Sequence, residues 1–220
     1  LNDYIKMQIE SVGQEITEQK ISVEKVEMKL VNGAGTIKGI KLNNPAQYSY
    51  PQVFTLGTVT LDINLKSLTS EPIIIDEILI DKPQAFVELT KDGQSNIKDL
   101  LDIIKKNTQT AQKKKSADTN TAQKEPKIRI TKLTLSGVAL SLDLSKLGNK
   151  EHTKILPSIT LLNIGGDAGL PSSELGAQII SQVLKAISKE ATKSQKKIIK
   201  DKVKDKLKDK IGKKLTDLFG

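Results

Sequence analysis

The stretch Thr58-Val59-Thr60-Leu61-Asp62-Ile63-Asn64-Leu65 decides the fold class of this 220-residue chain. Its aliphatic residues alternate with polar ones, which is the period of a β-strand with one face on a core and the other in water. Similar alternation occupies 127–147, where the aliphatic positions are Ile128, Ile130, Leu133, Leu135, Val138, Leu140, Leu142 and Leu144. It also occupies 21–30, where the phase slips by one residue at Glu24-Lys25, as it does at a β-bulge. These stretches predict a curved, bulged, mainly antiparallel sheet with the shape of a groove or half-pipe.

Helical patterns surround this sheet. The N-terminal residues have apolar side chains three and four positions apart, at Leu1, Ile5, Ile9, Val12 and Ile16. Ser95 can cap a mid-chain helix over Asn96–Lys106, and a third helix begins near Ser172 or Ser173. The predicted fold class is therefore α+β, with an N-terminal helix, a mid-chain helix and a long C-terminal amphipathic helix.

We expect two parts of the chain to build one sheet. Residues 1–107 hold the N-terminal helix, the first β module and the mid-chain helix. Residues 127–192 hold a second β-hairpin, a strand and a helix that complete the same sheet, and residues 193–220 form a lysine-rich amphipathic helix. Residues 108–126, between these two parts, are rich in Gln, Thr, Lys, Ser and Ala and lack apolar periodicity, which predicts a flexible linker.

The composition removes several kinds of site. The chain has no Cys and a single His, which excludes thiolate nucleophiles, disulfides and Cys-based metal sites. Aromatic residues make up only 3% of the chain, which disfavours sites that stack bases or sugars. We therefore expect no catalytic residue, no metal site and no cofactor, and a function other than that of an enzyme.

Three local patterns suggest chemistry but have plainer explanations. The glycines of Gly33-x-Gly35-x-x-x-Gly39 join two expected strands, whereas a dinucleotide-binding loop leads from a strand into a helix, so turns and bulges are expected there. His152 lies in a polar stretch, which predicts an exposed turn histidine. Asp76 and Glu77 are neighbours on an expected strand and point to opposite faces, so they do not form a catalytic carboxylate pair.

The C-terminal helix carries most of the charge. The whole chain has a formal charge of +9, and residues 193–220 contain eleven Lys against four Asp, a net +7. Apolar residues recur there every four positions, so their stripe winds around the helix and does not form the straight seam of a coiled coil. The residues expected to contact a membrane or a partner are Ile199, Lys200, Val203, Lys204, Leu207, Lys208, Ile211, Leu215 and Phe219.

Two interpretations of this helix remain open. A thin apolar stripe with abundant Lys is typical of helices that lie on anionic membranes, where each Lys contributes about 1 kcal/mol. The same residues also fit a solvated helix packed on its own domain, in which Asp201, Asp205 and Asp209 supply i,i+4 pairs. Nucleic acid is disfavoured as a partner, because Arg129 is the only arginine and no aromatic residue is interleaved with the lysines.

The order of strands and turns in the first half resembles a known family. The sequence runs Gly-Thr-Ile-x-Gly-Ile-x-Leu-x-Asn-Pro at 35–45, Phe-x-Leu-Gly at 54–57 and Ser-Leu-Thr-Ser at 67–70. It continues with Ile-x-Ile-Asp-Glu-Ile-x-Ile-Asp-x-Pro at 73–83 and Gly-x-Ser-Asn-Ile-x-x-Leu-Leu at 93–101. This order is similar to that of the AsmA-like proteins of bacterial envelopes, closely in the first half of the chain and loosely in the second. The chain resembles a short, single-module member.

The resemblance implies a periplasmic protein anchored to the inner membrane, here by an N-terminal segment absent from this chain. It also implies a β-groove and a part in moving phospholipids across the envelope. We therefore expect a non-catalytic protein that binds acyl chains and assists phospholipid transport or homeostasis, with phospholipid or an anionic membrane surface as its partner. The alternative is a structural or adaptor subunit of an envelope complex, which docks another envelope protein through its C-terminal helix.

The apolar face of the sheet is the candidate lipid site. It is either covered by the helices as an ordinary core or curved into a trough that holds acyl chains. Each buried methylene would contribute about 0.8 kcal/mol to lipid binding. The groove candidates are Val59, Leu61, Ile63, Leu65, Leu133, Leu135, Leu140, Leu142 and Leu144.

Overall fold

The structure is a computed structural model that describes residues 1–117 and 125–219. Among these residues are three α-helices, α1 (Asn2–Thr17), α2 (Asn96–Ala117) and α3 (Ser172–Phe219), and two 3-10 helices, η1 (Leu65–Thr69) and η2 (Ser145–Leu147). The strands are β1 (Ile21–Ser22), β2 (Lys25–Lys29), β3 (Ala34–Asn43), β4 (Gln52–Ile63), β5 (Ile73–Asp81), β6 (Gln84–Glu88), β7 (Lys127–Ser136), β8 (Ala139–Asp143), β9 (Glu151–Ile155), β10 (Ile159–Ile164) and β11 (Leu170–Pro171). All strands belong to one open sheet, which confirms the predicted α+β class with a mainly antiparallel sheet.

Consecutive strand segments combine into long strands that bend in the middle. The order across the sheet is β1–β2, β3, β4, β5–β6, β7–β8 and β9–β10. The register passes through each bend unchanged, because Asp81 pairs with Ser136 in the β5–β7 ladder and Gln84 pairs with Ala139 in the β6–β8 ladder. Those two ladders are parallel, and the others between the long strands are antiparallel.

The bends lie side by side and fold the sheet along a line. Gly39, Lys82 and Gly137 all have positive φ, of 65°, 50° and 65°. A Cβ on Gly39 would meet Glu24 of the neighbouring strand at 2.6 Å, and Lys82 N donates to Ser136 O at 2.7 Å beside Gly137. A left-handed residue at the same level in β3, between β5 and β6, and between β7 and β8 bends these strands in the same direction. The sheet therefore curves without closing.

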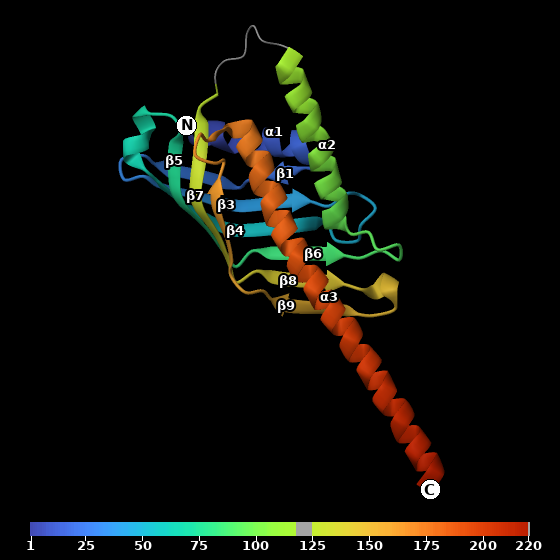
Figure 1. Ribbon diagram of the computed structural model, residues 1–220. Coiled ribbons are helices and arrows are strands. Elements are labelled where there is room, and N and C mark those ends of the chain that lie inside the picture. Colours follow the sequence, from blue (N-terminus) through green and yellow to red (C-terminus); the bar gives the residue numbers. More distant parts are fainter. Residues whose placement is uncertain (118–124, 220) are drawn as a thin grey trace.

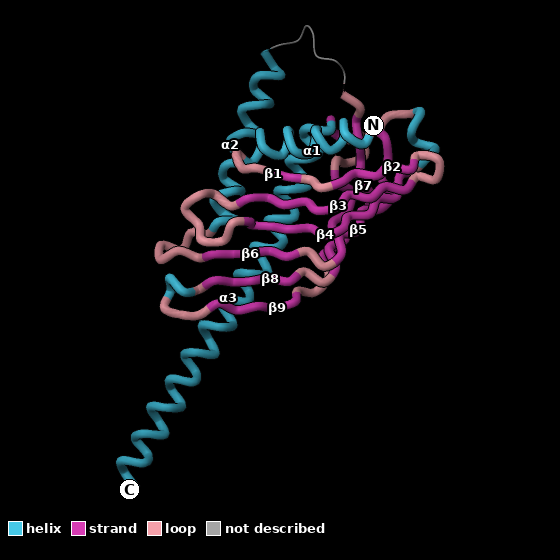
Figure 2. Tube along the Cα trace, turned by 180° about the vertical axis from the view of Figure 1, so that it is seen from behind, coloured by secondary structure: helices cyan, strands magenta, loops and turns pink. Residues whose placement is uncertain are grey.

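All three helices pack on one face of this sheet, which we call the concave face. Figure 1 shows α3 crossing the strands diagonally, with α2 beside it and α1 near β1. Figure 2, from behind, shows the strands uncovered on the opposite face. The core between helices and sheet is aliphatic and includes Leu100 of α2 and Ile187 of α3, both fully buried.

The two edges of the sheet differ in whether a helix covers them. Side chains of α1 bind the backbone of the β1–β2 edge: Glu10 Oε1 accepts from Val23 N at 2.8 Å, and Asn2 Oδ1 accepts from Met28 N at 3.1 Å. At the opposite edge, no strand lies beyond β9–β10 in the part of the chain that the structure describes. The helix therefore covers one edge and leaves the other open.

Two expected boundaries differ from the observed ones. The mid-chain helix, expected over 96–106, continues to Ala117, so residues 108–117 of the expected linker are helical. This stretch has no Gly or Pro, and Thr108 and Thr110 donate to the carbonyl oxygens of Ile104 and Lys106. Residues 118–124 of that linker lie outside the described residues. At the C-terminus, residues 172–192 and 193–219 form one unbroken helix.

Candidate functional site

Rows of aliphatic side chains cross the concave face from strand to strand. Residues that pair directly in a ladder point to the same side of the sheet, so the register defines each row. One row comprises Val26, Ile37, Val59, Ile80, Leu135 and Ile159. The next comprises Met28, Leu61, Ile78, Leu133 and Leu161, and the Met28 side chain lies over Gly35, which has no side chain of its own. The face is thus a continuous apolar surface and not a set of separate patches.

The groove candidates divide by their exposure. Val59, Leu133, Leu135, Leu140, Leu142 and Leu144 are buried in the core, with 5% exposure or less. Leu61 and Ile63 are half-buried, and Leu65 is 43% exposed. Leu65 is not on a strand, because β4 ends at Ile63 and Leu65 begins η1, whose turn is capped by the side chain of Asn64. The helices therefore cover most of the concave face and leave its β4 end partly open.

A buried polar cluster explains two of the sequence motifs. Asn96 Nδ2 donates to Asn44 Oδ1 at 2.8 Å and to Phe86 O at 2.7 Å, and Asn96 Oδ1 accepts from Glu88 N at 3.0 Å. The Asn-Pro motif at 44–45 and the Ser-Asn-Ile motif at 95–97 are thus joined across the fold. Because both amides are buried and bonded, they fix the start of α2 against β6.

Glu88 is the fully buried carboxylate of this cluster. Its oxygens accept from Ser49 N at 2.6 Å and from Lys146 Nζ at 2.6 Å. Burial alone raises the pKa of Glu88, but the bonds from Lys146 and Ser49 outweigh it and hold that pKa below the ordinary value. With its oxygens bonded in this way, Glu88 forms a buried ion pair with Lys146 of η2 and binds the backbone at Ser49.

The glycine pattern is borne out in part. Gly33 has positive φ at the turn between β2 and β3, which confirms its interpretation as a turn residue. The bulges expected at Gly39 and at Glu24-Lys25 are wrong, because the pairing keeps one register on both sides of each position and the strands bend there without an extra residue. Glu77 forms an ion pair with Lys132 at 2.8 Å, whereas Asp76 lies at 3.5 Å from Asn64 Nδ2. Neighbours on β5 therefore have separate partners.

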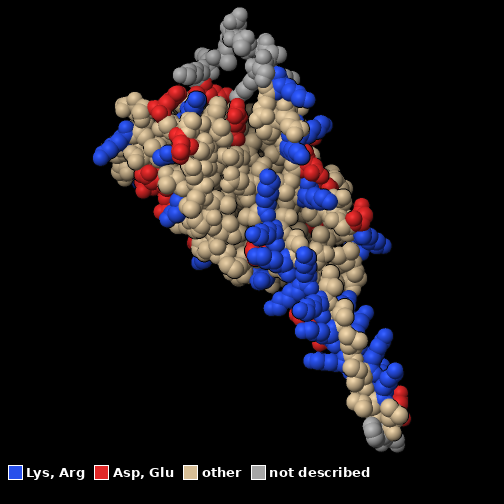
Figure 3. All heavy atoms as spheres, in the orientation of Figure 1, with Lys and Arg blue, Asp and Glu red and all other residues tan. Residues whose placement is uncertain are grey.

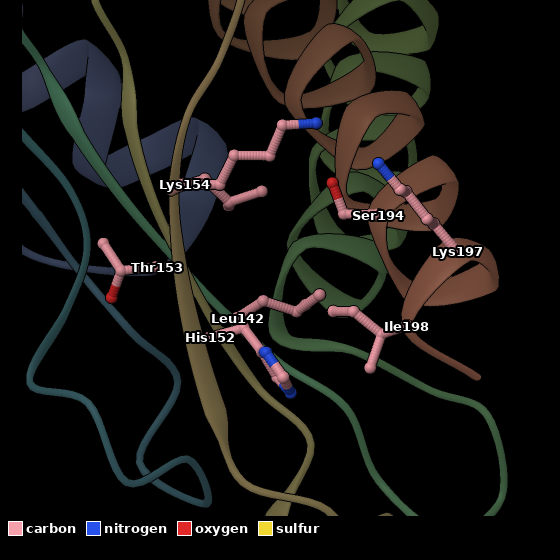
Figure 4. A pocket seen from close by; sticks show the side chains of 8 residues that line it. Leu142, His152, Thr153, Lys154, Ser194, Lys197 and Ile198 are labelled. Carbon is pink, nitrogen blue, oxygen red and sulfur yellow. The ribbon is translucent and has the colours of Figure 1, made fainter. Parts of the chain in front are cut away.

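The interpretation of His152 as an exposed turn residue is wrong. His152 lies on β9, opposite Leu142 of β8, and its side chain is half-buried. It lines a cavity of about 230 Å³ between these strands and α3 (Figure 4). The polar stretch Asn149-Lys150-Glu151 is typical of a turn, but residues 151–155 pair with β8 and form an edge strand. Period-two alternation of His152, Lys154 and Leu156 was the signal available in the sequence.

The C-terminal part of α3 leaves the body of the protein. We call residues 172–198 the packed segment and residues 199–219 the projecting segment. In the projecting segment the exposure is 46% at Ile199, 54% at Leu207 and 58% at Ile211, and every residue from 199 to 218 is exposed. Lys202 Nζ still donates to Gly148 O at 2.8 Å, near the point where the helix departs.

The stripe residues thus keep the spacing expected of them and are not used by the core. Val203 and Leu215 are half-exposed, and Lys200, Lys204 and Lys208 are exposed beside them. Phe219 ends the helix, and its side chain lies outside the described residues. Figure 3 shows the basic side chains gathered along this part of α3, with an uncharged strip between them.

Comparison with known proteins agrees with this architecture. No curated protein matches the chain. None of the helices in the described residues is both long enough and apolar enough to span a membrane. The sequence model of the AsmA family matches residues 35–156, from β3 through β9, and so extends the resemblance into the second half of the chain. The chain therefore belongs to the AsmA family, whose members are associated with the bacterial envelope and are generally not enzymes.

Proposed function

We propose that this protein is a non-catalytic, periplasmic member of its family that is anchored to the inner membrane through an N-terminal segment. In this proposal it binds lipid acyl chains against the concave face of its sheet and assists phospholipid transport or homeostasis in the envelope. The observation that supports it is the continuity of the aliphatic rows across the whole sheet.

The dimensions of the rows suit an acyl chain. Neighbouring strands lie about 4.8 Å apart, so a row across six strands is about 24 Å long. One leaflet of a bilayer supplies about half of a hydrocarbon core of about 30 Å, which is the depth that one acyl chain fills. Each methylene that contacts the row would contribute about 0.8 kcal/mol. A single row is therefore long enough to hold one chain along its entire length.

The packed segment of α3 acts as the cover of this face in the proposal. Leu184 and Ile187 of α3 occupy the concave side where an acyl chain would lie. The half-buried end, at Leu61, Ile63 and Ile75, offers apolar contact before the cover moves. The acyl chain and α3 then compete for the same side chains of the sheet. The helix is therefore displaced from this end as the acyl chain enters.

A photo-crosslinking experiment tests the proposal. A photoreactive amino acid is placed at Leu61, which is half-buried on the concave face, and in a matched variant at Thr60, which is exposed on the opposite face. After irradiation in cells, lipid adducts are identified by mass spectrometry. We expect adducts at 61 and none at 60. Equal labelling at both positions, or none at either, would rule out acyl binding on this face.

A second candidate function rests on the projecting segment. Its apolar stripe is exposed and its lysines surround it, as in a helix that lies on a membrane or docks a partner protein. The adaptor function requires the stripe but no lipid on the concave face. The variant Val203→Gln, Leu207→Gln, Ile211→Gln keeps the charge and removes the stripe.

Vesicle flotation and affinity capture separate the two uses of this segment. If it lies on membranes, the glutamine variant loses flotation with anionic vesicles and keeps its captured proteins. If it serves an adaptor, the variant loses a captured envelope protein and floats as the parent protein does. Lys185→Gln, on the packed segment, is the control and changes neither result.

A further inference from the structure

The cavity between β8, β9 and α3 lies at the open edge of the concave face. Its floor is apolar, formed by Leu140, Leu142 and Ile198. Leu140 belongs to the row that also holds Leu42, Phe54 and Ala85, so the floor continues the aliphatic surface of the concave face. The cavity is thus the point at which an apolar row reaches the outside.

The side chains on β9 break the aliphatic pattern of these rows. Lys154 pairs with Leu140 and His152 pairs with Leu142, so both point to the concave side. On β10, the equivalent edge positions are Ile159 and Leu161. His152 is half-buried and Lys154 is exposed, so a ring and an ammonium group stand at this edge where the rows elsewhere have aliphatic side chains. The change of residue type is therefore local to this cavity.

Ser194 of α3 contributes a hydroxyl with no partner. The residue is 8% exposed, and its Oγ has no hydrogen-bond partner among the described residues. A helical hydroxyl ordinarily donates to the carbonyl four residues earlier, as Thr192 does to Ser188 O at 2.9 Å. Ser194 lines the cavity and leaves that bond unmade, so its hydroxyl is available to a group inside (Figure 4).

The charges around the cavity have a single sign. Figure 4 shows Lys154 reaching from β9 toward α3, while Lys197 and Ser194 extend from α3. None of the lining residues is acidic, and neither lysine has an ion-pair partner among the described residues. On the same helix Lys193 does have one, since it pairs with Glu190 at 2.8 Å. The cavity therefore combines two ammonium groups with a free hydroxyl and lacks a counter-charge.

We propose that this cavity binds the phosphate group of a lipid headgroup. Two ammonium groups and a hydroxyl supply donors suited to phosphate oxygens, and the apolar floor leads from the phosphate toward the aliphatic rows. A volume of about 230 Å³ is below the roughly 300–1,000 Å³ of pockets that enclose drug-sized ligands, so it holds the headgroup and not the acyl chains. The proposal deepens the proposed lipid-binding function, on which it rests for the identity of the ligand.

The single histidine provides the test. His152 is the only histidine of the chain, so its ring signals in an NMR spectrum need no assignment. The full chain is titrated with three probes: short-chain phosphatidylglycerol below its micelle concentration, short-chain diacylglycerol, and inorganic phosphate. We expect the ring signals to shift with phosphatidylglycerol at low concentration, with inorganic phosphate only at much higher concentration, and not with diacylglycerol.

Variants separate the cavity from general attraction to charge. Lys154→Gln with Lys197→Gln should weaken phosphatidylglycerol binding about tenfold or more, because each lost ammonium removes a charge-assisted bond. Lys150→Gln with Lys196→Gln, which makes the same charge change outside the cavity, should leave binding within about twofold. Ser194→Ala should weaken binding about threefold without lowering the urea midpoint, since it removes a buried hydroxyl that makes no bond.

Three other results of the titration and crosslinking experiments would each decide a different point. Equal shifts with phosphatidylglycerol and diacylglycerol would overturn the headgroup site and leave acyl binding standing. Equal potency of inorganic phosphate and phosphatidylglycerol would overturn a lipid as the source of the phosphate. Shifts with phosphatidylglycerol, combined with no crosslinks at 61, would support the headgroup site and count against acyl binding on the concave face.

Discussion

The two segments of α3 belong to one unbroken helix of 48 residues but serve different physical purposes. In the packed segment, Leu184 and Ile187 are fully buried against the sheet and α2. In the projecting segment, Leu207 and Ile211 have similar side chains and are more than half exposed. Residue type therefore does not decide burial here. The spacing does, because it determines whether apolar side chains gather on one side of the helix.

The spacing of the apolar residues differs between the packed and projecting segments, and this difference bears on why one is buried and the other exposed. In the packed segment, the apolar residues Ile180, Leu184, Ile187 and Ala191 follow at steps of four, three and four, are buried or half-buried, and stay on one face. In the projecting segment a strict step of four carries each apolar residue about 40° around the axis. Such a stripe cannot stay against one surface for many turns. Since the unbroken helix also runs past β9, the last strand at this edge in the described residues (Figure 1), the stripe remains exposed.

Hydrogen exchange should show the largest difference between the segments. Amides around Ile187 can open only when the core opens, so their exchange should require nearly the full free energy of unfolding, about 5–15 kcal/mol. Amides around Leu207 are held by the helix alone and should show protection of about 1 kcal/mol or less. Exchange measured by NMR or mass spectrometry at neutral pH checks this. Protection of the projecting segment equal to that of the packed segment would indicate a tertiary contact that the fold does not show.

Replacing one isoleucine in each segment by alanine compares the contribution of the two segments to the stability of the protein. Ile187→Ala should lower the free energy of unfolding by about 2–5 kcal/mol, since it leaves a cavity in the core. Ile211→Ala should change it by less than about 0.5 kcal/mol, because the side chain contacts mainly water. Urea unfolding of both variants gives the two values. A large loss for Ile211→Ala would mean that its stripe is buried in an oligomer.

The sequence was sufficient for the body of the fold and for the shape of the stripe. Alternation at 58–65 predicted the strand and its buried face correctly, since one-sided burial forces that period on β4. It could not show that Leu65 belongs to η1, because the turn depends on Asn64 and Ser67 bonding to the backbone. The alternation also left open whether the face is a trough or a core, since both need the same apolar residues.

The cavity was missed for a physical reason. His152 and Lys154 are polar residues on an edge strand, where exposed and inward positions have similar compositions. Only the register with Leu140 and Leu142 shows which side they face, and only the path of α3 brings Ser194 and Lys197 opposite them. The residues on β9 lie some 40 positions before those on α3, and no local sequence pattern predicts that the two sets are close in space.

Acid should weaken the body through Glu88. Its pKa is lowered in the folded protein from an ordinary value of 4.5, so the carboxylate contributes stability above that pH and loses it as the pH falls through the folded pKa. Glu88→Gln should cost about 1.5–3 kcal/mol at pH 6 and flatten the decline of stability below about pH 4.5. Glu190→Gln, which alters an ion pair on the surface of the packed segment, should cost less than about 1 kcal/mol. Urea unfolding at pH 6 and pH 3.5 measures both.

Replacing single lysines should give the smallest effect and show which segment of α3 contacts a membrane. Lys204→Gln should reduce partition onto anionic vesicles by about 1 kcal/mol, or about fivefold, at low salt, because the lysine lies beside the exposed stripe. Lys189→Gln, on the packed segment, should have a weaker effect, because no exposed stripe holds that lysine at the surface. Both differences should shrink as salt is raised, since the attraction is screened within about 10 Å at 0.1 M. If the two variants bind equally, the attraction comes from net charge alone, and the stripe has a partner other than lipid.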